Sequence, residues 1–265
     1  MRRVAQIHFV PAALVQGREV GTGVAVRVQA HQERAVLRRF AQPARVVAEC
    51  STVTVPGDDK TAVTPTDELV VLVHGLAAGP SWMRPLARFL ERQGYRTHCW
   101  RYASLAGSLQ VHAPRLRQVL RDCMARARRV HVVAHSMGSI VTRLALAGES
   151  WPELGRVVLL APPNHGSPVA RLLAPFAGRL CPAVAELSSH PASLVHRMNP
   201  PRGVEVGTIR ARYDLLVPGS STMLDGQQDH IGFHATHTSL LLQRSVARQV
   251  HAFLATGRFH RPAAD

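Results

Sequence analysis

The chain has 265 residues, 46% of them hydrophobic, which is enough for one domain with a large core. No stretch approaches the roughly 20 consecutive apolar residues that a membrane-spanning helix needs. The formal charge of +15 invites a nucleic-acid interpretation, but Lys60 is the only lysine among 32 basic residues and the arginines are dispersed. Such an excess of arginine over lysine is typical of a genome-wide coding bias and not of a binding surface. We therefore expect no nucleic-acid partner and at most weak attraction to a membrane surface.

The densest run of arginines, from Arg115 to Arg129, falls on a predicted exposed helix and is interpreted as a solvated helix face. The four cysteines form no C-x-x-C pair, which favours free thiols in a reducing compartment. The N-terminal stretch 4–15 is moderately apolar, but it contains His8 and Pro11 and lacks a small-residue cleavage site. We therefore expect a cytoplasmic location.

Two regions differ in character. Residues 1–66 have no regular strand and helix rhythm and end in a turn-rich stretch, so they are predicted to be an N-terminal extension of uncertain structure. Residues 67–265 form the predicted main domain, in which strand and helix alternate. Strands are predicted over 68–75, 96–102, 129–135, 156–163 and 204–213, and helices over 81–93, 112–126, 137–147 and 238–254.

This alternation predicts an α/β fold, with a mostly parallel central sheet and helices on both of its faces. The strand around Cys99 is expected to be buried. Catalytic groups in such sheets lie at the carboxyl ends of strands. A candidate catalytic residue should therefore follow the end of a predicted strand.

The run V-H-V-V-A-H-S-M-G-S-I-V puts Ser136 at a corner between a buried strand and an amphipathic helix. Small residues two before and two after a serine let the chain turn sharply and expose its hydroxyl, and the helix N-terminus favours a developing anion. Glycine usually occupies both small positions, but here Ala134 occupies the first and Gly138 the second. An ordinary helix N-cap serine is the structural alternative.

The segment AHSMGSIVTRLAL, together with LVVLVHGLAAGPSWMRPLARFLERQGY upstream, resembles the lipase and esterase branch of the α/β-hydrolase superfamily. It is similar to bacterial triacylglycerol-lipase-like proteins over about residues 68–256. The resemblance implies the α/β-hydrolase fold and cleavage of carboxylic esters of hydrophobic, lipid-like small molecules through an acyl-enzyme on Ser136. It implies no cofactor and no metal.

Acyl transfer needs N–H donors where negative charge develops. One predicted donor is the backbone N–H of Met137, directly after the nucleophile. The second comes from the loop HGLAAGPSW, where the resemblance points to the N–H of Leu76. His74 and Gly75 shape this turn and are the predicted substrate-binding residues.

A serine hydroxyl needs an imidazole to take its proton and a carboxylate to orient that imidazole. Asp214 follows a predicted strand, in a Y-D-x-x-V-P segment that resembles the acid-bearing loop of lipases. Asp225 and Asp229 are the competitors, and a turn-forming role explains Asp225.

His237 precedes the last predicted helix and resembles the terminal histidine of these enzymes. His234 is the alternative base. Together with His230 the two histidines could bind a metal if the segment were helical, but Gly232 disfavours a helix there and no H-E-x-x-H occurs.

Residues 164–203 have the size of a cap over the site, and A-P-P-N-H-G-S-P at its start (161–168) resembles the stretch before the lid of lipases. Apolar helical material is predicted over 169–180 and 184–198, either as a mobile lid or as ordinary core helices. An acyltransferase, thioesterase or amidase would use the same residues. A non-catalytic binding protein with this fold is a further alternative.

Overall fold

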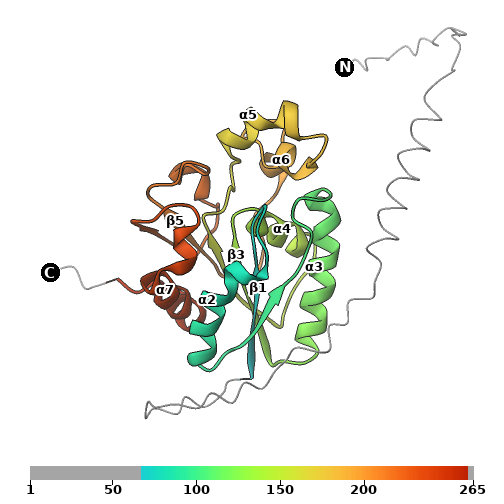
Figure 1. The fold of residues 1–265 in the computed structure, drawn as a ribbon. Coiled ribbons are helices and arrows are strands. Elements are labelled where there is room, and N and C mark those ends of the chain that lie inside the picture. Colours follow the sequence, from blue (N-terminus) through green and yellow to red (C-terminus); the bar gives the residue numbers. More distant parts are fainter. Residues whose placement is uncertain (1–66, 262–265) are drawn as a thin grey trace, which may run out of the picture. The chain divides into compact units, whose positions relative to one another are not determined.

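The computed structural model describes residues 67–261 (Figure 1). The predicted N-terminal extension 1–66 and residues 262–265 lie outside the described residues. The strands are β1 (Glu68–Val73), β2 (Arg96–Trp100), β3 (Arg129–His135), β4 (Leu154–Leu160), β5 (Val206–Ala211) and β6 (Asp229–Phe233). The α-helices are α2 (Pro80–Arg92), α3 (Leu109–Met124), α4 (Met137–Leu146), α5 (Pro168–Ala177), α6 (Pro182–Glu186) and α7 (Arg244–Thr256), with short 3-10 helices η1 (Leu194–Arg197), η2 (Gly219–Thr222) and η3 (Ser239–Leu242).

The strands form one six-stranded sheet in the order β2-β1-β3-β4-β5-β6, and every neighbouring pair is parallel. This confirms the predicted α/β fold. β6 was not predicted, because Asp229–Phe233 is a partly exposed edge strand without an apolar run. Its backbone nevertheless pairs with β5, from Gly207 opposite Asp229 to Ala211 opposite Phe233.

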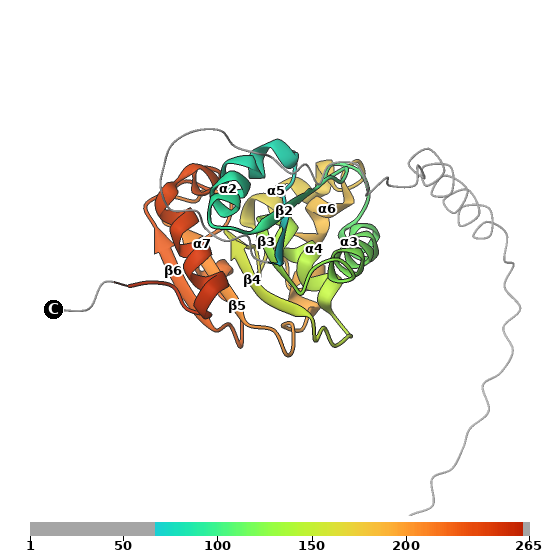
Figure 2. The same cartoon turned by 90° about the horizontal axis from the view of Figure 1, so that it is seen from below.

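Helices cover both faces of the sheet (Figure 2). On one face, alternate strand residues such as Val71 and Val132 pack with buried side chains of α3 and α4. On the other face, residues such as Leu72 and Val133 pack with α2 and α7. Burial on both faces explains why the central strands have continuous apolar runs.

Three details of the prediction are wrong. The helical material predicted over 184–198 is limited to the end of α6, at Glu186, and the four-residue η1. Cys99 is only half-buried, because β2 is an edge strand that pairs with β1 alone. The last helix was expected over 238–254, but Gln243 has an extended backbone (φ −82°, ψ 122°) that separates η3 from α7. This break lets Leu240 and Leu241 both enter the core.

The segment between β4 and β5 forms α5, α6 and η1, which lie beyond the carboxyl ends of the strands (Figure 1). Ala183 and Val184 of α6 are buried, whereas α5 has no buried residue. Within residues 67–261, no helix is long and apolar enough to cross a membrane. We use the name cap segment for residues 164–203.

Several histidines are buried beneath the carboxyl edge of the sheet. His112 of α3 is buried and meets the ring of Tyr102 edge-on, with 4.9 Å between the ring centroids. Burial lowers the pKa of His112 from its ordinary value, because the imidazolium cannot be solvated there.

A histidine with a lowered pKa in the folded state makes the protein sensitive to acid. Its contribution is fully present above the unfolded-state pKa, near 6.5, and is lost as the pH falls toward the lower folded-state value. We expect the free energy of unfolding, measured with denaturant, to fall between pH 7.5 and pH 5. His112→Leu should make this fall smaller, and an equal or steeper fall in the variant would contradict the assignment.

Candidate active site

Ser136 lies at the corner between β3 and α4 in a strained backbone conformation. Its φ of 53° and ψ of −126° are unusual for a residue other than glycine. Its N–H donates to the carbonyl of Leu160 (2.9 Å), and its own carbonyl accepts from the N–H of Ser139 (2.9 Å). These bonds from β4 and α4 hold the corner in place, and a strained residue of this kind is typical of functional sites.

Gly138 allows α4 to begin this close to the sheet. A β-carbon at this position would stand 2.5 Å from the carbonyl oxygen of His74 and 2.7 Å from that of Val73. The other small position tolerates a methyl group, because Ala134 is fully buried in the core on the α4 side of the sheet. The substitution of glycine by Ala134 therefore leaves the corner intact.

A continuous chain of hydrogen bonds joins Ser136, His237 and Asp214. The Ser136 hydroxyl lies 2.8 Å from Nε2 of His237, and Nδ1 of His237 lies 2.6 Å from Oδ2 of Asp214. Since a carboxylate only accepts, Nδ1 carries the proton and Nε2 is free to accept from the hydroxyl. The structure thus brings together three residues that are separated in the chain by 101 and 23 positions.

Asp214 is held by backbone donors. Its Oδ1 accepts from the N–H groups of Leu216 and Val217, both at 2.9 Å, and its side chain is only 1% exposed. Both carboxylate oxygens therefore have fixed partners, which leaves Oδ2 aimed at the imidazole.

The other candidate acids and bases lie outside this chain. His234 is exposed and contacts the hydroxyl of Tyr213 (2.8 Å) and the guanidinium of Arg212 (3.3 Å). Asp229 binds Arg261 near the end of the described chain. Asp225 is exposed in a turn, and His230 lies on β6 beside Thr208 (2.7 Å).

His230 lies on β6, and His234 and His237 lie in the loop that follows it. The three histidines therefore do not share a helix. The described residues contain no group of three or more side chains suited to hold a metal ion.

The predicted oxyanion loop runs close to Ser136. A β-carbon on Gly75 would stand 3.0 Å from Cβ of Ser136, so a larger residue at this position would crowd the nucleophile. In the described part of the chain, the N–H groups of Leu76 and Met137 have no hydrogen-bond partner. Both are therefore available to an oxygen of a bound substrate.

The side chain of His74 lies beneath this loop, where it is fully buried and cannot line the surface of the site. It stacks on Tyr102 at 4.3 Å, and Tyr102 stacks on Trp100 at 4.5 Å. The Tyr102 hydroxyl donates to the carbonyl of His74 (2.6 Å), and Nδ1 of His74 donates to the carbonyl of Gly75 (2.9 Å). The ring stack therefore supports the loop from below.

Tyr102 and His135 also belong to the site, although the sequence did not predict them. Tyr102 follows the end of β2, at the same edge of the sheet as the other site residues, and that position is a usable signal. His135 directly precedes Ser136, at a position of the corner that varies between such sequences. Its Nε2 lies 3.0 Å from the carbonyl oxygen of His237, a contact that no local pattern reveals.

The cap segment is fastened to the site at its first residues. The hydroxyl of Ser167, the N-cap of α5, donates to the carbonyl of Leu216 (2.6 Å) in the loop that holds Asp214. The buried guanidinium of Arg143 on α4 donates to Oδ1 of Asn164 (3.1 Å) and to the carbonyl of Met198 (3.2 Å). Both ends of the cap segment are thus bound to the hydrolase domain.

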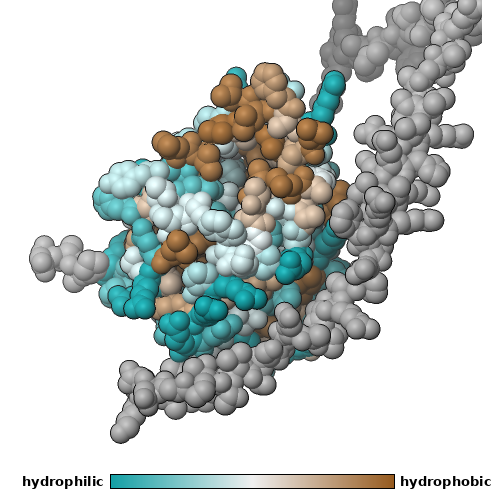
Figure 3. Space-filling model, in the orientation of Figure 1, coloured by the Kyte–Doolittle hydropathy of each residue, from teal (hydrophilic) through white to brown (hydrophobic). Residues whose placement is uncertain are grey.

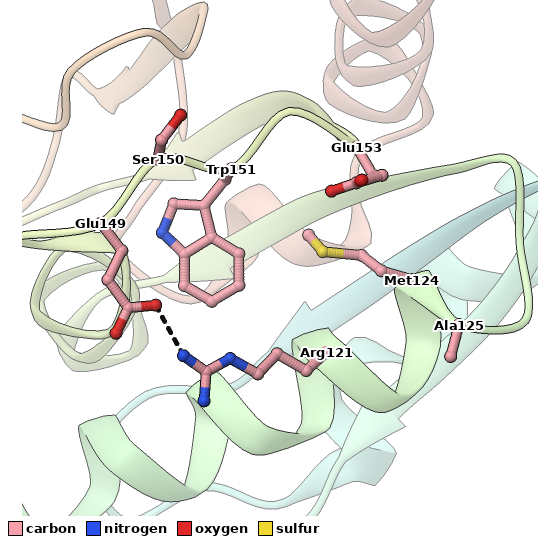
Figure 4. A pocket seen from close by; sticks show the side chains of 7 residues that line it. All are labelled: Arg121, Met124, Ala125, Glu149, Ser150, Trp151 and Glu153. Carbon is pink, nitrogen blue, oxygen red and sulfur yellow. Dashed lines mark hydrogen bonds and ion pairs between the residues drawn. The ribbon is translucent and has the colours of Figure 1, made fainter.

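A pocket of about 420 Å³ lies away from this site (Figure 4). It is lined by Arg121, Met124, Ala125, Glu149, Ser150, Trp151 and Glu153. Arg121 binds Glu149 (2.8 Å) and stands over the ring of Trp151 (5.9 Å). These residues come from the end of α3 and the segment before β4, so they lie at the amino ends of the strands and contribute nothing to the Ser136 site.

The fold is that of the α/β-hydrolase class. The chain belongs to the serine aminopeptidase family S33, whose model matches residues 64–202, more than half of the chain. A comparison with curated protein sequences finds no match.

Solved lipase structures are similar to the chain. The mature lipase of Bacillus licheniformis is 19% identical, with a TM-score of 0.61 over 77% of this chain and 96% of its own. Aspergillus fumigatus lipase B is 17% identical, with a TM-score of 0.60 over 71% of this chain and 52% of its own. A Paleococcus ferrophilus monoacylglycerol lipase is 15% identical, with a TM-score of 0.58 over 73% of this chain and 96% of its own. At these identities the likeness shows the fold. Together with the family model it confirms the predicted superfamily.

Gly138→Ala tests the close packing of the corner. We expect kcat for any substrate of this site to fall at least about tenfold, because the new methyl group pushes α4 away from the end of β1. Gly148→Ala is the control: it has φ +79° and open space, so it should lower stability by about 1 kcal/mol and leave kcat unchanged. Equal kcat values for Gly138→Ala and wild type would contradict the packing argument.

Proposed function

We propose that the chain is a serine hydrolase that cleaves carboxylic esters of hydrophobic, lipid-like substrates. Ser136 is the nucleophile, His237 the general base and Asp214 the residue that orients the base. The observation that supports this most strongly is the hydrogen-bond chain from Ser136 through His237 to Asp214, at a strained corner on the carboxyl edge of the sheet.

In the proposed reaction, Nε2 of His237 takes the hydroxyl proton of Ser136 as Oγ attacks the ester carbonyl carbon. The N–H groups of Leu76 and Met137 donate to the oxygen that becomes negatively charged. His237 then gives its proton to the departing alcohol, which leaves an acyl group on Ser136. Water, activated by the same imidazole, hydrolyses this acyl-enzyme and regenerates the serine.

Exposed apolar side chains beside Asp214 and on α5 support a hydrophobic substrate. Leu215, directly after Asp214, is 90% exposed, and Leu172 and Phe176 of α5 are 72% and 81% exposed. Figure 3 shows hydrophobic residues gathered over α5 and α6. Exposed apolar surface of this kind favours contact with a hydrophobic acyl chain or with the hydrophobic alcohol part of an ester substrate.

An amide substrate is the second candidate, because the matched family model is that of a serine aminopeptidase. An aminopeptidase needs a carboxylate to hold the free ammonium group of its substrate. Glu186 is the only acidic residue of the cap segment, and its Oε2 accepts from the N–H of Leu109 (2.6 Å). This lack of a free carboxylate in the cap segment favours the ester over the peptide.

Activity measurements with p-nitrophenyl esters of increasing chain length and with amino-acid p-nitroanilides test the proposal. Ser136→Ala and His237→Ala should each lower kcat by on the order of 10⁴-fold or more, and Asp214→Asn by roughly 10⁴-fold. His234→Ala, which removes the alternative base, should retain wild-type kcat. A wild type that cleaves anilides faster than esters would contradict the ester proposal, and an inactive folded wild type would favour a non-catalytic binding protein.

We also propose weak association with anionic membrane surfaces from within the cytoplasm, a location supported by the free thiols of Cys99 and Cys181. Arg171 and Arg179 flank the exposed apolar residues of α5. Cations beside inserted apolar side chains are the usual chemistry of such contacts.

Sedimentation with phosphatidylglycerol vesicles tests this association. The double change Arg171→Ser and Arg179→Ser should reduce the bound fraction severalfold. The matched control, Arg88→Ser with Arg92→Ser, removes the same charge from exposed positions of α2 and should bind like wild type. Equal binding by all three proteins, or equal losses in both double variants, would contradict a specific role of α5.

A further inference from the structure

His135 is buried and directly precedes the proposed nucleophile, Ser136. It contacts the loop that carries the proposed base, His237, which we call the base loop. It is 5% exposed, and its ring lies 4.9 Å from the ring of His237, with an angle of 52° between the two planes. Its Nε2 lies 3.0 Å from the carbonyl oxygen of His237. A carbonyl oxygen only accepts, so Nε2 of His135 carries the hydrogen.

The surroundings keep His135 neutral. Burial lowers its pKa to about 4, and the neighbouring imidazole of His237 adds to this effect. A neutral imidazole has one hydrogen, so Nδ1 of His135 is an unprotonated nitrogen. It faces the predicted oxyanion loop, since a β-carbon on Gly75 would stand 3.2 Å from it.

The loop that carries His237 is also held at neighbouring residues, where the N–H of Thr236 donates to Oγ of Ser239 (2.8 Å) and the side-chain amide of Gln243 donates to the carbonyl of His234 (3.0 Å). Ala235 accepts from the N–H of Tyr213 (3.0 Å), and Thr238 accepts from the N–H of Leu241 (3.1 Å). Among the described residues, the carbonyl of His237 itself is bound only by His135. The side-chain bonds of His237 can hold its ring in a productive position only if this backbone is also fixed.

We propose that His135 is a positioning residue for the general base: its Nε2–H holds the backbone of His237 so that the imidazole points at Ser136. The inference rests on the proposed function. Because His135 and Ser136 are neighbours in the chain, the strained corner would fix the nucleophile and the base together. An error of about 1 Å in such a pair costs on the order of 100-fold in rate.

Two substitutions separate the donated hydrogen from simple filling of space. His135→Met fills a similar volume without a donor, whereas the amide nitrogen of His135→Gln reaches the place of Nε2 and can donate to the same carbonyl. With a short, soluble p-nitrophenyl ester, His135→Met should lower kcat by about 10- to 100-fold and leave KM within about twofold. His135→Gln should recover kcat to within about fivefold of wild type.

His131→Gln is the matched control, because His131 is a fully buried histidine of the same strand that lies away from the site, bonded to the N–H of Arg156 (2.9 Å). This change should lower stability and leave kcat per folded molecule unchanged. A reduced kcat in His131→Gln would mean that the loss in His135→Met comes from general loosening of β3. That result would overturn the proposal.

A second readout needs no substrate. The hydrogen between Nδ1 of His237 and Asp214 should give a low-field proton resonance in wild type and in His135→Gln, and a shifted or broadened one in His135→Met. If wild type hydrolyses no ester but these spectra differ as expected, the positioning role stands while the proposed function fails. Unchanged spectra or kcat in His135→Met, no recovery in folded His135→Gln, or an effect on KM alone would overturn the proposal.

Discussion

The site depends on the strained corner at Ser136. A positive φ at a non-glycine residue costs roughly 1–3 kcal/mol, so surrounding contacts must enforce it. The carbonyl of Leu160 fixes the N–H of Ser136, and the absence of a side chain at Gly138 lets α4 start against the end of β1. The corner then exposes the hydroxyl at the carboxyl edge of the sheet, with the N-terminus of α4 behind it. Once this geometry exists, a base, an acid and N–H donors need only come from loops at the same edge.

The support under these loops comes from neutral rings and backbone bonds, with few ion pairs. His74 and Tyr102 stack beneath the predicted oxyanion loop, and His135 donates to the base loop. Burial disfavours the charged form of an imidazole, so these rings stay uncharged and act as rigid, partly apolar packing with one directed hydrogen bond each. The cost of this arrangement is sensitivity to acid. The cap segment adds a different element, because α5 exposes apolar side chains and yet its N-cap Ser167 is bonded to the loop that carries Asp214.

Much of this architecture could be predicted from sequence. Apolar runs such as LVVLV within β1 predict strands buried on both faces, and Ser136 and Asp214 each follow a predicted strand that ends at the catalytic edge. His237 could be predicted only from the helix that follows it and from the family resemblance. β6 could not be predicted, because an edge strand pairs through its backbone and Asp229–Phe233 has no burial pattern. The break at Gln243 depends on how Leu240 and Leu241 fit the core. The role of His135 depends on the direction of a carbonyl 102 positions away, which is a property of the folded chain alone.

The central claim is that Ser136 is a nucleophile activated by His237. The most direct measurement is reaction of the folded protein with a fluorophosphonate, followed by mass spectrometry of the intact chain and of its peptides. The account predicts one adduct per chain, located on Ser136, which forms far more slowly in His237→Ala. No adduct on the folded wild type, an adduct on another residue, or equal labelling rates in wild type and His237→Ala would contradict it.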